Sequence, residues 1–202
     1  AGICLNHTAF PPPARPRGAR VVGLIGSFGW HPTYSAGLRL LTRLWPEIKR
    51  RVPAARLQIV GRKARSALSP WAAGPDISLC ENVPDTIPYF RSTDVLLYAP
   101  ARGSGMKVKT LEAFALGTPV VTTSEGVEGL PAEDGVHAGL SEDDAGLIER
   151  TVALLEDPAR RDRQRRAARA LLESYCRPDP VLDRLEQVYA TLSGRSNPRD
   201  LG

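Results

Sequence analysis

Two lysines and a glutamate follow a glycine-containing turn near the middle of the chain. Residues Ala99 to Glu112 read APARGSGMKVKTLE and lie between an apolar run and an amphipathic stretch. Gly103 and Gly105 allow a tight turn and a close approach of the backbone to a ligand. Free amide groups at the start of the helix that follows carry partial positive charge, which suits a phosphate. The segment is therefore a candidate phosphate-binding turn.

Lys109 and Glu112 are three residues apart, so they share one face of the expected helix. A neighbouring apolar face, made of Val108, Leu111 and Ala115, is expected to pack on a sheet. A cation beside a phosphate-binding turn, with a carboxylate one turn further, fits a nucleotide diphosphate site in which the carboxylate accepts hydrogen bonds from a ribose diol. From spacing alone, an exposed Lys109–Glu112 ion pair worth a few tenths of a kcal/mol explains the pattern equally well.

The elements that must position this turn alternate between strands and helices. Apolar runs predict strands at 21–25, 56–60, 77–79, 95–98 and 119–122, and helices are expected at 36–51, 86–92, 107–116 and over most of 142–192. Pro46 is expected to end or kink the first helix. The alternation predicts an α/β fold, a Rossmann-like parallel sheet with helices on both faces. Ligands of such sheets bind beyond the carboxyl ends of the strands.

The composition is that of an ordinary globular domain. Of 202 residues, 42% are hydrophobic and 24% charged, and no apolar run approaches the roughly 18 residues of a membrane-spanning helix. Four prolines between 11 and 16 predict an extended linker over 1–20, followed by a Rossmann-like domain over 21–193 and a flexible tail over 194–202. The three cysteines form no CxxC pair, so neither a disulfide framework nor a zinc site is indicated, and a cytoplasmic location is the default expectation.

The positive charge is concentrated in one segment. The net charge is +5, and six arginines lie between Arg160 and Arg169. A solvated helix face explains this run. A second interpretation is attraction to anionic lipid headgroups or a phosphorylated ligand, hence peripheral association with the inner face of an anionic membrane. No aromatic residues interleave with the arginines and no nucleic-acid-binding motif occurs, so a nucleic acid partner is not expected.

Four segments, in order, resemble the C-terminal, donor-binding half of a GT-B fold glycosyltransferase of family 4, also called glycosyltransferase group 1. They are GSFGWHP at 26–32, the stretch from Trp45-Pro46 to Gly61-Arg62, the stretch from Val83-Pro84-Asp85 to Ala99-Pro100, and residues 103–130. The resemblance covers nearly the whole chain. It implies transfer of a sugar from a nucleotide diphosphate sugar, with retention at the anomeric carbon and with neither metal nor cofactor. The implied acceptor is a cell-surface glycan or a lipid-linked molecule, as in polysaccharide biosynthesis.

The resemblance also implies residue roles. Glu112 is similar to the second glutamate of the family's Glu-x7-Glu motif, which holds the ribose, and the amides of residues 106–110 would cradle the diphosphate. Gly61, Arg62, Asn82 and Val83 would flank the base, and residues 26–29 would lie near the phosphates and the sugar. The expected catalytic residues are Lys107 and Lys109. The expected substrate-binding residues are Gly26, Ser27, Phe28, Gly29, Gly61, Arg62, Asn82, Val83, Ser104, Gly105, Met106, Val108, Thr110 and Glu112.

The sequence departs from the family pattern in three ways. Ser104 stands where many members have the first glutamate, and residues 30–35 contain no arginine or lysine, so phosphate charge falls to Arg102, Lys107 and Lys109. The acceptor-binding half is expected upstream, so the chain by itself is expected to bind donor without glycosylating anything.

Two alternatives remain: a catalytically inert nucleotide-sugar-binding module, and another GT-B enzyme such as a sugar-nucleotide epimerase or a phosphorylase.

Overall fold

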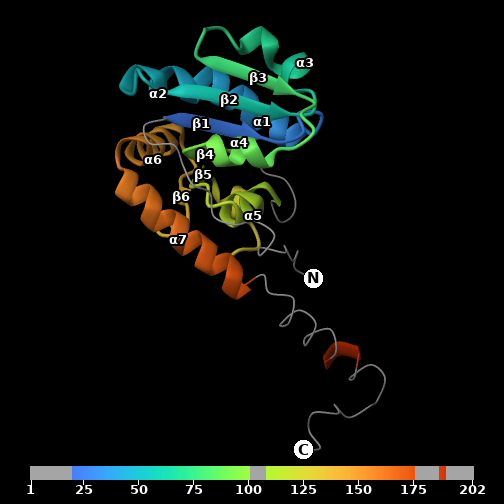
Figure 1. Ribbon diagram of the computed structural model, residues 1–202, viewed down its shortest axis with the longest axis vertical. Coiled ribbons are helices and arrows are strands. Elements are labelled where there is room, and N and C mark those ends of the chain that lie inside the picture. Colours follow the sequence, from blue (N-terminus) through green and yellow to red (C-terminus); the bar gives the residue numbers. More distant parts are fainter. Residues whose placement is uncertain (1–19, 101–107, 176–186, 190–202) are drawn as a thin grey trace, which may run out of the picture.

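A six-stranded parallel sheet forms the centre of the computed structural model, which describes residues 20–100, 108–175 and 187–189 (Figure 1). The spatial order of the strands is β3-β2-β1-β4-β5-β6. The strands are β1 (Val21–Ile25), β2 (Arg56–Gly61), β3 (Ile77–Glu81), β4 (Val95–Tyr98), β5 (Val120–Thr122) and β6 (Gly139–Leu140). Every pairing is parallel, so all carboxyl ends lie along one edge.

Helices cover both faces of the sheet, as the alternating pattern requires. They are α1 (His31–Arg39), α2 (Trp45–Arg51), α3 (Ala64–Leu68), α4 (Ile87–Ser92), α5 (Val108–Ala115), α6 (Asp144–Glu156) and α7 (Pro158–Tyr175). One core cluster joins α1, α2, α3 and α6 to the sheet, and a second joins α4, α5 and α7 to it. Successive residues of β4 enter different clusters, Val95 and Leu97 the first and Leu96 the second, which explains the absence of polar alternation.

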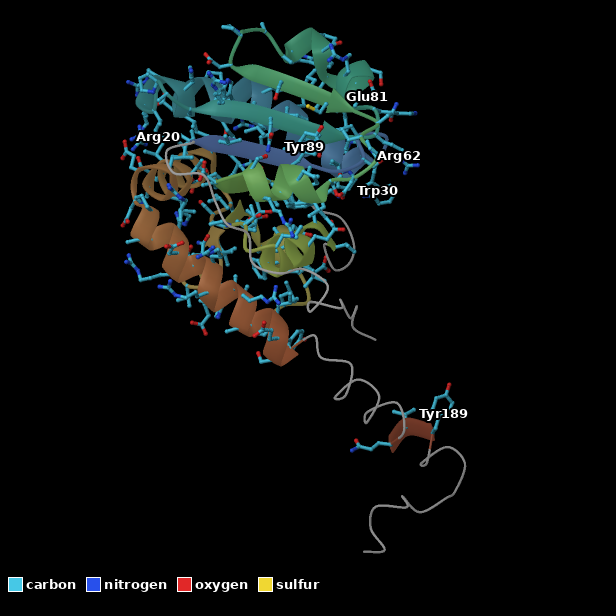
Figure 2. All side chains as sticks on the ribbon, in the orientation of Figure 1. Arg20, Trp30, Arg62, Glu81, Tyr89 and Tyr189 are labelled. Carbon is cyan, nitrogen blue, oxygen red and sulfur yellow. The ribbon has the colours of Figure 1, made fainter. Side chains whose placement is uncertain are left out.

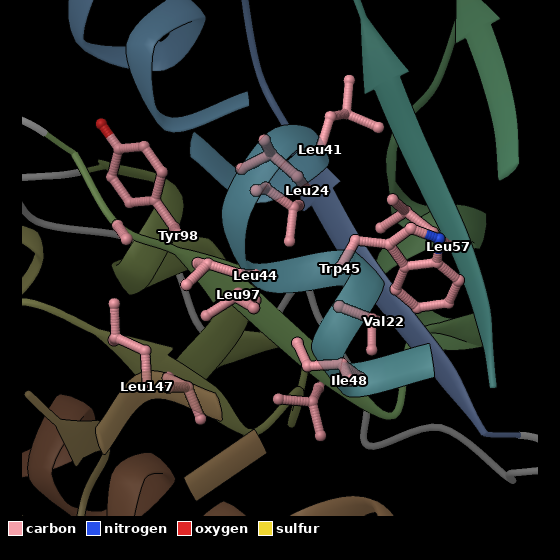
Figure 3. Close-up of a cluster of buried hydrophobic side chains, with 14 of the residues drawn as sticks. Val22, Leu24, Leu41, Leu44, Trp45, Ile48, Leu57, Leu97, Tyr98 and Leu147 are labelled. Carbon is pink, nitrogen blue, oxygen red and sulfur yellow. The ribbon is translucent and has the colours of Figure 1, made fainter. Parts of the chain in front are cut away.

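The first helical stretch differs from its prediction. It begins at His31 rather than 36 and passes through a π-helical segment, η2 (Leu40–Leu44), into α2. Pro46 therefore does not end the helical stretch. It lies in the first turn of α2, where its missing N–H is tolerated, directly after the wider π turn. Leu41, Leu44, Trp45 and Ile48 from this stretch pack against β1, β2 and β4 (Figure 3).

The predicted α/β fold is confirmed, and the strand bounds agree to within two residues. The expectation of helix over most of 142–192 agrees with α6 and α7 as far as Tyr175, and residues 176–186 and 190–192 lie outside the described residues. The elements α3 and β6 and the short helical turns η3 (Ser69–Trp71) and η4 (Ser124–Val127) had no prediction. The expected linker over 1–20, apart from Arg20, and the expected tail over 194–202 lie outside the described residues. None of the described helices combines the length and the apolar character needed to cross a bilayer.

Candidate functional site at the carboxyl edge of the sheet

The chain changes direction between two neighbouring strands. The connection after β1 leads to α1, on the face that carries the first core cluster, whereas β4 is followed by α5 on the opposite face. This strand order creates a crevice beyond the carboxyl ends of β1 and β4, where doubly wound sheets bind ligands. The loop after β1 and the start of α5 are therefore the two walls of the candidate site.

The loop after β1 is attached to the end of β2 by its backbone. The Gly26 amide donates to the Val60 carbonyl and the Phe28 amide donates to the Arg62 carbonyl, both at 2.9 Å. Gly61 has φ +134°, and a Cβ there would lie 1.9 Å from the Gly26 carbonyl oxygen. Glycine is thus required at 61, both for its backbone conformation and for the close approach of the two chains. Phe28 is only 3% exposed, so its side chain anchors the loop in the core rather than facing the crevice.

Lys109 connects the two walls. Its side chain crosses to the loop after β1, so that a Cβ at Gly26 would lie 2.1 Å from Lys109 Cε. The ammonium lies 5.2 Å from the centre of the Tyr98 ring at the end of β4, within the range of a cation–π contact. Burial raises the pKa of the Tyr98 phenol, and the neighbouring Thr33 hydroxyl partly offsets that rise. Tyr98 and Gly26 together hold a cation at the switch point of the sheet.

Glu112 lies one helical turn beyond Lys109 and is half-buried. Burial raises the pKa of its carboxyl group, and the ammonium of Lys109 partly offsets this effect. A partly desolvated carboxylate beside a cation can accept two hydrogen bonds from a sugar diol, and these bonds are stronger out of bulk water. The two residues that spacing identified are therefore next to each other at the crevice.

The start of α5 corrects one prediction. Leu111 and Ala115 pack in the core as expected, but Val108 is 40% exposed, because the first residue of α5 lies at the open edge of the sheet. Thr110 is fully buried and its hydroxyl donates to the Gly126 carbonyl, so its side chain fixes α5 in place and does not face a ligand. Lys107, Ser104, Gly105 and Met106 lie outside the described residues.

The residues expected around a base come together at the ends of β2 and β3. Gly61 pairs in register with Glu81, and Asn82 follows with the left-handed φ of +55°. Val83, which is half-buried, packs against the second core cluster. Arg62 is exposed and helps to line a hollow of about 370 Å³ with Ser27, Gly29, Trp30 and Lys63. Lys63 and Trp30 were not among the expected site residues.

The arginines of α7 do not form one uniform basic surface. Arg161, Arg165 and Arg169, spaced by four, turn toward the body of the domain and have side chains 15%, 25% and 23% exposed. Arg161 donates to the carbonyls of Leu154 and Leu155 at the end of α6. Arg163, in contrast, is 65% exposed. The run is thus divided between internal anchors and solvated residues, and membrane attachment stays a prediction.

No cluster of three or more His, Cys, Asp or Glu side chains suited to a metal ion occurs within residues 20–100, 108–175 and 187–189. The candidate site as described consists of the glycine-containing loop after β1, of cations and of one carboxylate. Such a set fits an anionic, sugar-bearing ligand.

Solved structures share this fold. TarM of S. aureus, in a complex with UDP and two other ligands, has a TM-score of 0.71 at 13% identity. The alignment covers 89% of this chain and 38% of the TarM chain. Sucrose-phosphate synthase of Thermosynechococcus elongatus has a TM-score of 0.71 at 18% identity, and the alignment covers 96% of this chain and 52% of the synthase chain. The C-terminal domain of LpcC, a glycosyl transferase group 1 protein of Francisella tularensis, has a TM-score of 0.65 at 15% identity. Here the alignment covers 86% of this chain and 99% of the LpcC domain.

These likenesses establish the fold, and the chain spans only 38% and 52% of the TarM and sucrose-phosphate synthase chains. No curated protein sequence matches this chain significantly. A family model does match, over residues 19–157, and its description is "Glycosyl transferases group 1". The match contains all six strands and both walls of the crevice. The chain belongs to the glycosyl transferases group 1 family.

Proposed function

We propose that this chain is the donor-binding domain of a retaining glycosyltransferase of the GT-B type. It binds a nucleotide diphosphate sugar in the crevice beyond β1 and β4, and the sugar passes to an acceptor held by another domain. The observation that carries the proposal is the meeting of Lys109, Glu112 and the Gly26 loop at the topological switch point. The family membership and the UDP found with the TarM structure support it.

The chemistry follows from where charge develops. As the glycosidic bond to the donor phosphate breaks, the leaving diphosphate gains negative charge. The N-terminal amides of α5 and the Lys109 ammonium face that position, so they stabilise the transition state more than the ground state. Glu112 accepts hydrogen bonds from the ribose and thereby fixes the nucleotide. Transfer with retention at the anomeric carbon, to a cell-surface glycan or lipid-linked acceptor, is part of the proposal.

Calorimetric titration of the chain with UDP, GDP and their sugar conjugates tests donor binding. We expect one nucleotide to bind saturably, and Glu112→Ala to weaken it by about tenfold or more, because a hydrogen-bonded charged partner of the ribose is lost. Glu156→Ala, which removes an exposed carboxylate at the end of α6, is the matched control and should bind as the wild type does. Equal affinity of the Glu112→Ala and Glu156→Ala variants would refute the assigned role of Glu112.

An inert nucleotide-sugar-binding module is the second candidate function, favoured by Ser104 at the position of the first motif glutamate. This candidate predicts the same nucleotide binding but no transfer. Sugar transfer by the longer protein that carries an acceptor domain, abolished by Glu112→Ala, would exclude the inert module. Formation of an epimerised sugar nucleotide by that protein would favour an epimerase instead.

A further inference from the structure

The loop after β1 lacks a cation of its own. Residues 26–35 read GSFGWHPTYS and contain neither lysine nor arginine. The structure brings cations to this loop from two other elements. Lys109 of α5 lies against Gly26, and Lys63, from the turn between β2 and α3, lies against Gly29, where a Cβ would be 3.4 Å from Lys63 Cδ and 3.9 Å from its Nζ. One loop is thus flanked by a lysine on each side.

Lys63 adopts a backbone conformation that disfavours a lysine. It has φ +58° and ψ +21°, in the left-handed region, and it forms the N-cap of α3 without a side-chain cap hydrogen bond. A non-glycine residue in this region costs about 1 kcal/mol, and such costs concentrate at functional sites. In this conformation the Lys63 side chain lies against Gly29.

The hollow beside Lys63 is positively charged. Its described lining includes two cations, Arg62 and Lys63, and no carboxylate. The neighbouring Glu81 is already engaged, since its carboxylate accepts from the Ser66 amide at 3.2 Å and from the Ser66 hydroxyl at 2.9 Å. Trp30, the N-cap residue of α1, also lines the hollow, so the N-terminal end of that helix lies beside it. Figure 2 shows Trp30 and Arg62 together at the carboxyl end of the strands, opposite Arg20.

We propose that Lys63, which stands outside the loop after β1, is a further binding residue for the donor diphosphate, which it contacts in this hollow with Arg62 beside it. This inference rests on the proposed donor site and deepens it: the diphosphate lies along the Gly26–Gly29 loop, with Lys109 on the side of β4 and Lys63 on the side of β2. Both ammonium groups then share the charge of one anion. Trp30, which is 60% exposed, borders the same anion and is a natural fluorescent reporter of its binding.

The variant Lys63→Gly separates binding from folding. Glycine suits the left-handed backbone, so this variant should unfold at a denaturant concentration equal to or higher than that of the wild type. It should nevertheless bind the preferred nucleoside diphosphate about tenfold more weakly, because a charged contact to phosphate is lost. Lys63→Arg, which keeps the charge, should retain most of the affinity. Arg166→Gln removes one positive charge from α7, far from the hollow in the chain, and should bind as the wild type does.

Salt dependence provides a second readout, since the difference between wild type and Lys63→Gly should shrink as ionic strength rises. Unchanged affinity of Lys63→Gly, in a protein whose binding is lost with Glu112→Ala, would overturn the role of Lys63 while leaving the donor site intact. A parallel fall of stability and affinity would also overturn it, because it would assign Lys63 a structural role.

If neither UDP nor GDP binds the wild type, the proposed donor site is refuted, and anion binding in the hollow needs a separate test. Titration with inorganic pyrophosphate, followed by the fluorescence of Trp30, addresses this case, with Trp30→Phe as the control for the signal. A saturable change that Lys63→Gly abolishes supports a diphosphate site in the hollow. The absence of such a change, or its persistence in Lys63→Gly, overturns the inference.

Discussion

At the scale of single residues, the site is made of groups that the fold holds at some energetic cost. Glu112 keeps a carboxyl group in a half-buried position, where burial raises its pKa above the usual 4.5. Lys63 occupies a left-handed backbone conformation. Neither residue is placed where its own chemistry is most stable in the absence of a ligand. Both positions make sense if a bound ligand uses the carboxylate and the ammonium.

The raised pKa of Glu112 predicts how stability depends on pH. The folded protein holds the Glu112 proton more tightly than the unfolded chain does, so ionising this group reduces stability as pH rises through its pKa. Glu112→Gln should therefore raise the free energy of unfolding at about pH 7, by less than about 1 kcal/mol for a partly exposed carboxyl. At about pH 3, where both states are protonated, the gain should vanish. Urea denaturation at the two pH values measures it.

The same change should weaken donor binding at about pH 7, because the amide side chain replaces a charged acceptor. Stability and affinity then change in opposite directions. Glu156→Gln, at an exposed position at the end of α6, is the control and should change neither. Loss of stability in Glu112→Gln at about pH 7 would contradict the burial cost assigned to this carboxyl.

At the scale of elements, the contact between the β1–α1 loop and the end of β2 forms one wall of the site. Gly61→Ala should destabilise the domain strongly, since its Cβ would lie 1.9 Å from the Gly26 carbonyl oxygen. Gly74→Ala is a matched control, because Gly74 has a similar φ of +126° but no atom within 4 Å of a Cβ. The first variant should lose at least about 2 kcal/mol more than the second in chemical denaturation. Equal losses would mean that backbone strain, and not the close approach, makes glycine necessary.

Sequence patterns predict those elements whose residues carry a strong local signal. Apolar runs located β1, β2 and β4 closely, because both faces of these strands are buried. The two-residue β6 and the five-residue α3 are too short for any period to be visible. The spacing of Lys109 and Glu112 indicated one helix face, but the contact of Lys109 with Gly26 and Tyr98 depends on the tertiary fold. The contact of Lys63 with Gly29 likewise depends on the tertiary fold, and no local sequence pattern predicts it.

At the scale of the whole molecule, two hollows with basic linings are candidate sites for an anion. One borders the Gly26–Gly29 loop at the carboxyl edge of the sheet. The other, of about 350 Å³, lies between the end of α5 and the middle of α7, lined by Ala115, Gly117, Arg165, Arg166, Arg169, Ala170 and Glu173. The second hollow contains a carboxylate, and Arg169 there already pairs with Glu173 at 2.6 Å. The position of the first hollow at the carboxyl edge of the sheet, where parallel sheets bind ligands, favours it for a diphosphate.

The most direct test of this account is to map nucleotide binding on the backbone amide resonances of the isotope-labelled chain. Titration with the preferred nucleoside diphosphate should shift the amides of Gly26, Gly61, Lys109 and Thr110, at the carboxyl edge of the sheet. Shifts confined to Gly117 and to Arg165–Glu173, or no shifts at saturating nucleotide in a folded domain, would contradict a donor site at this edge.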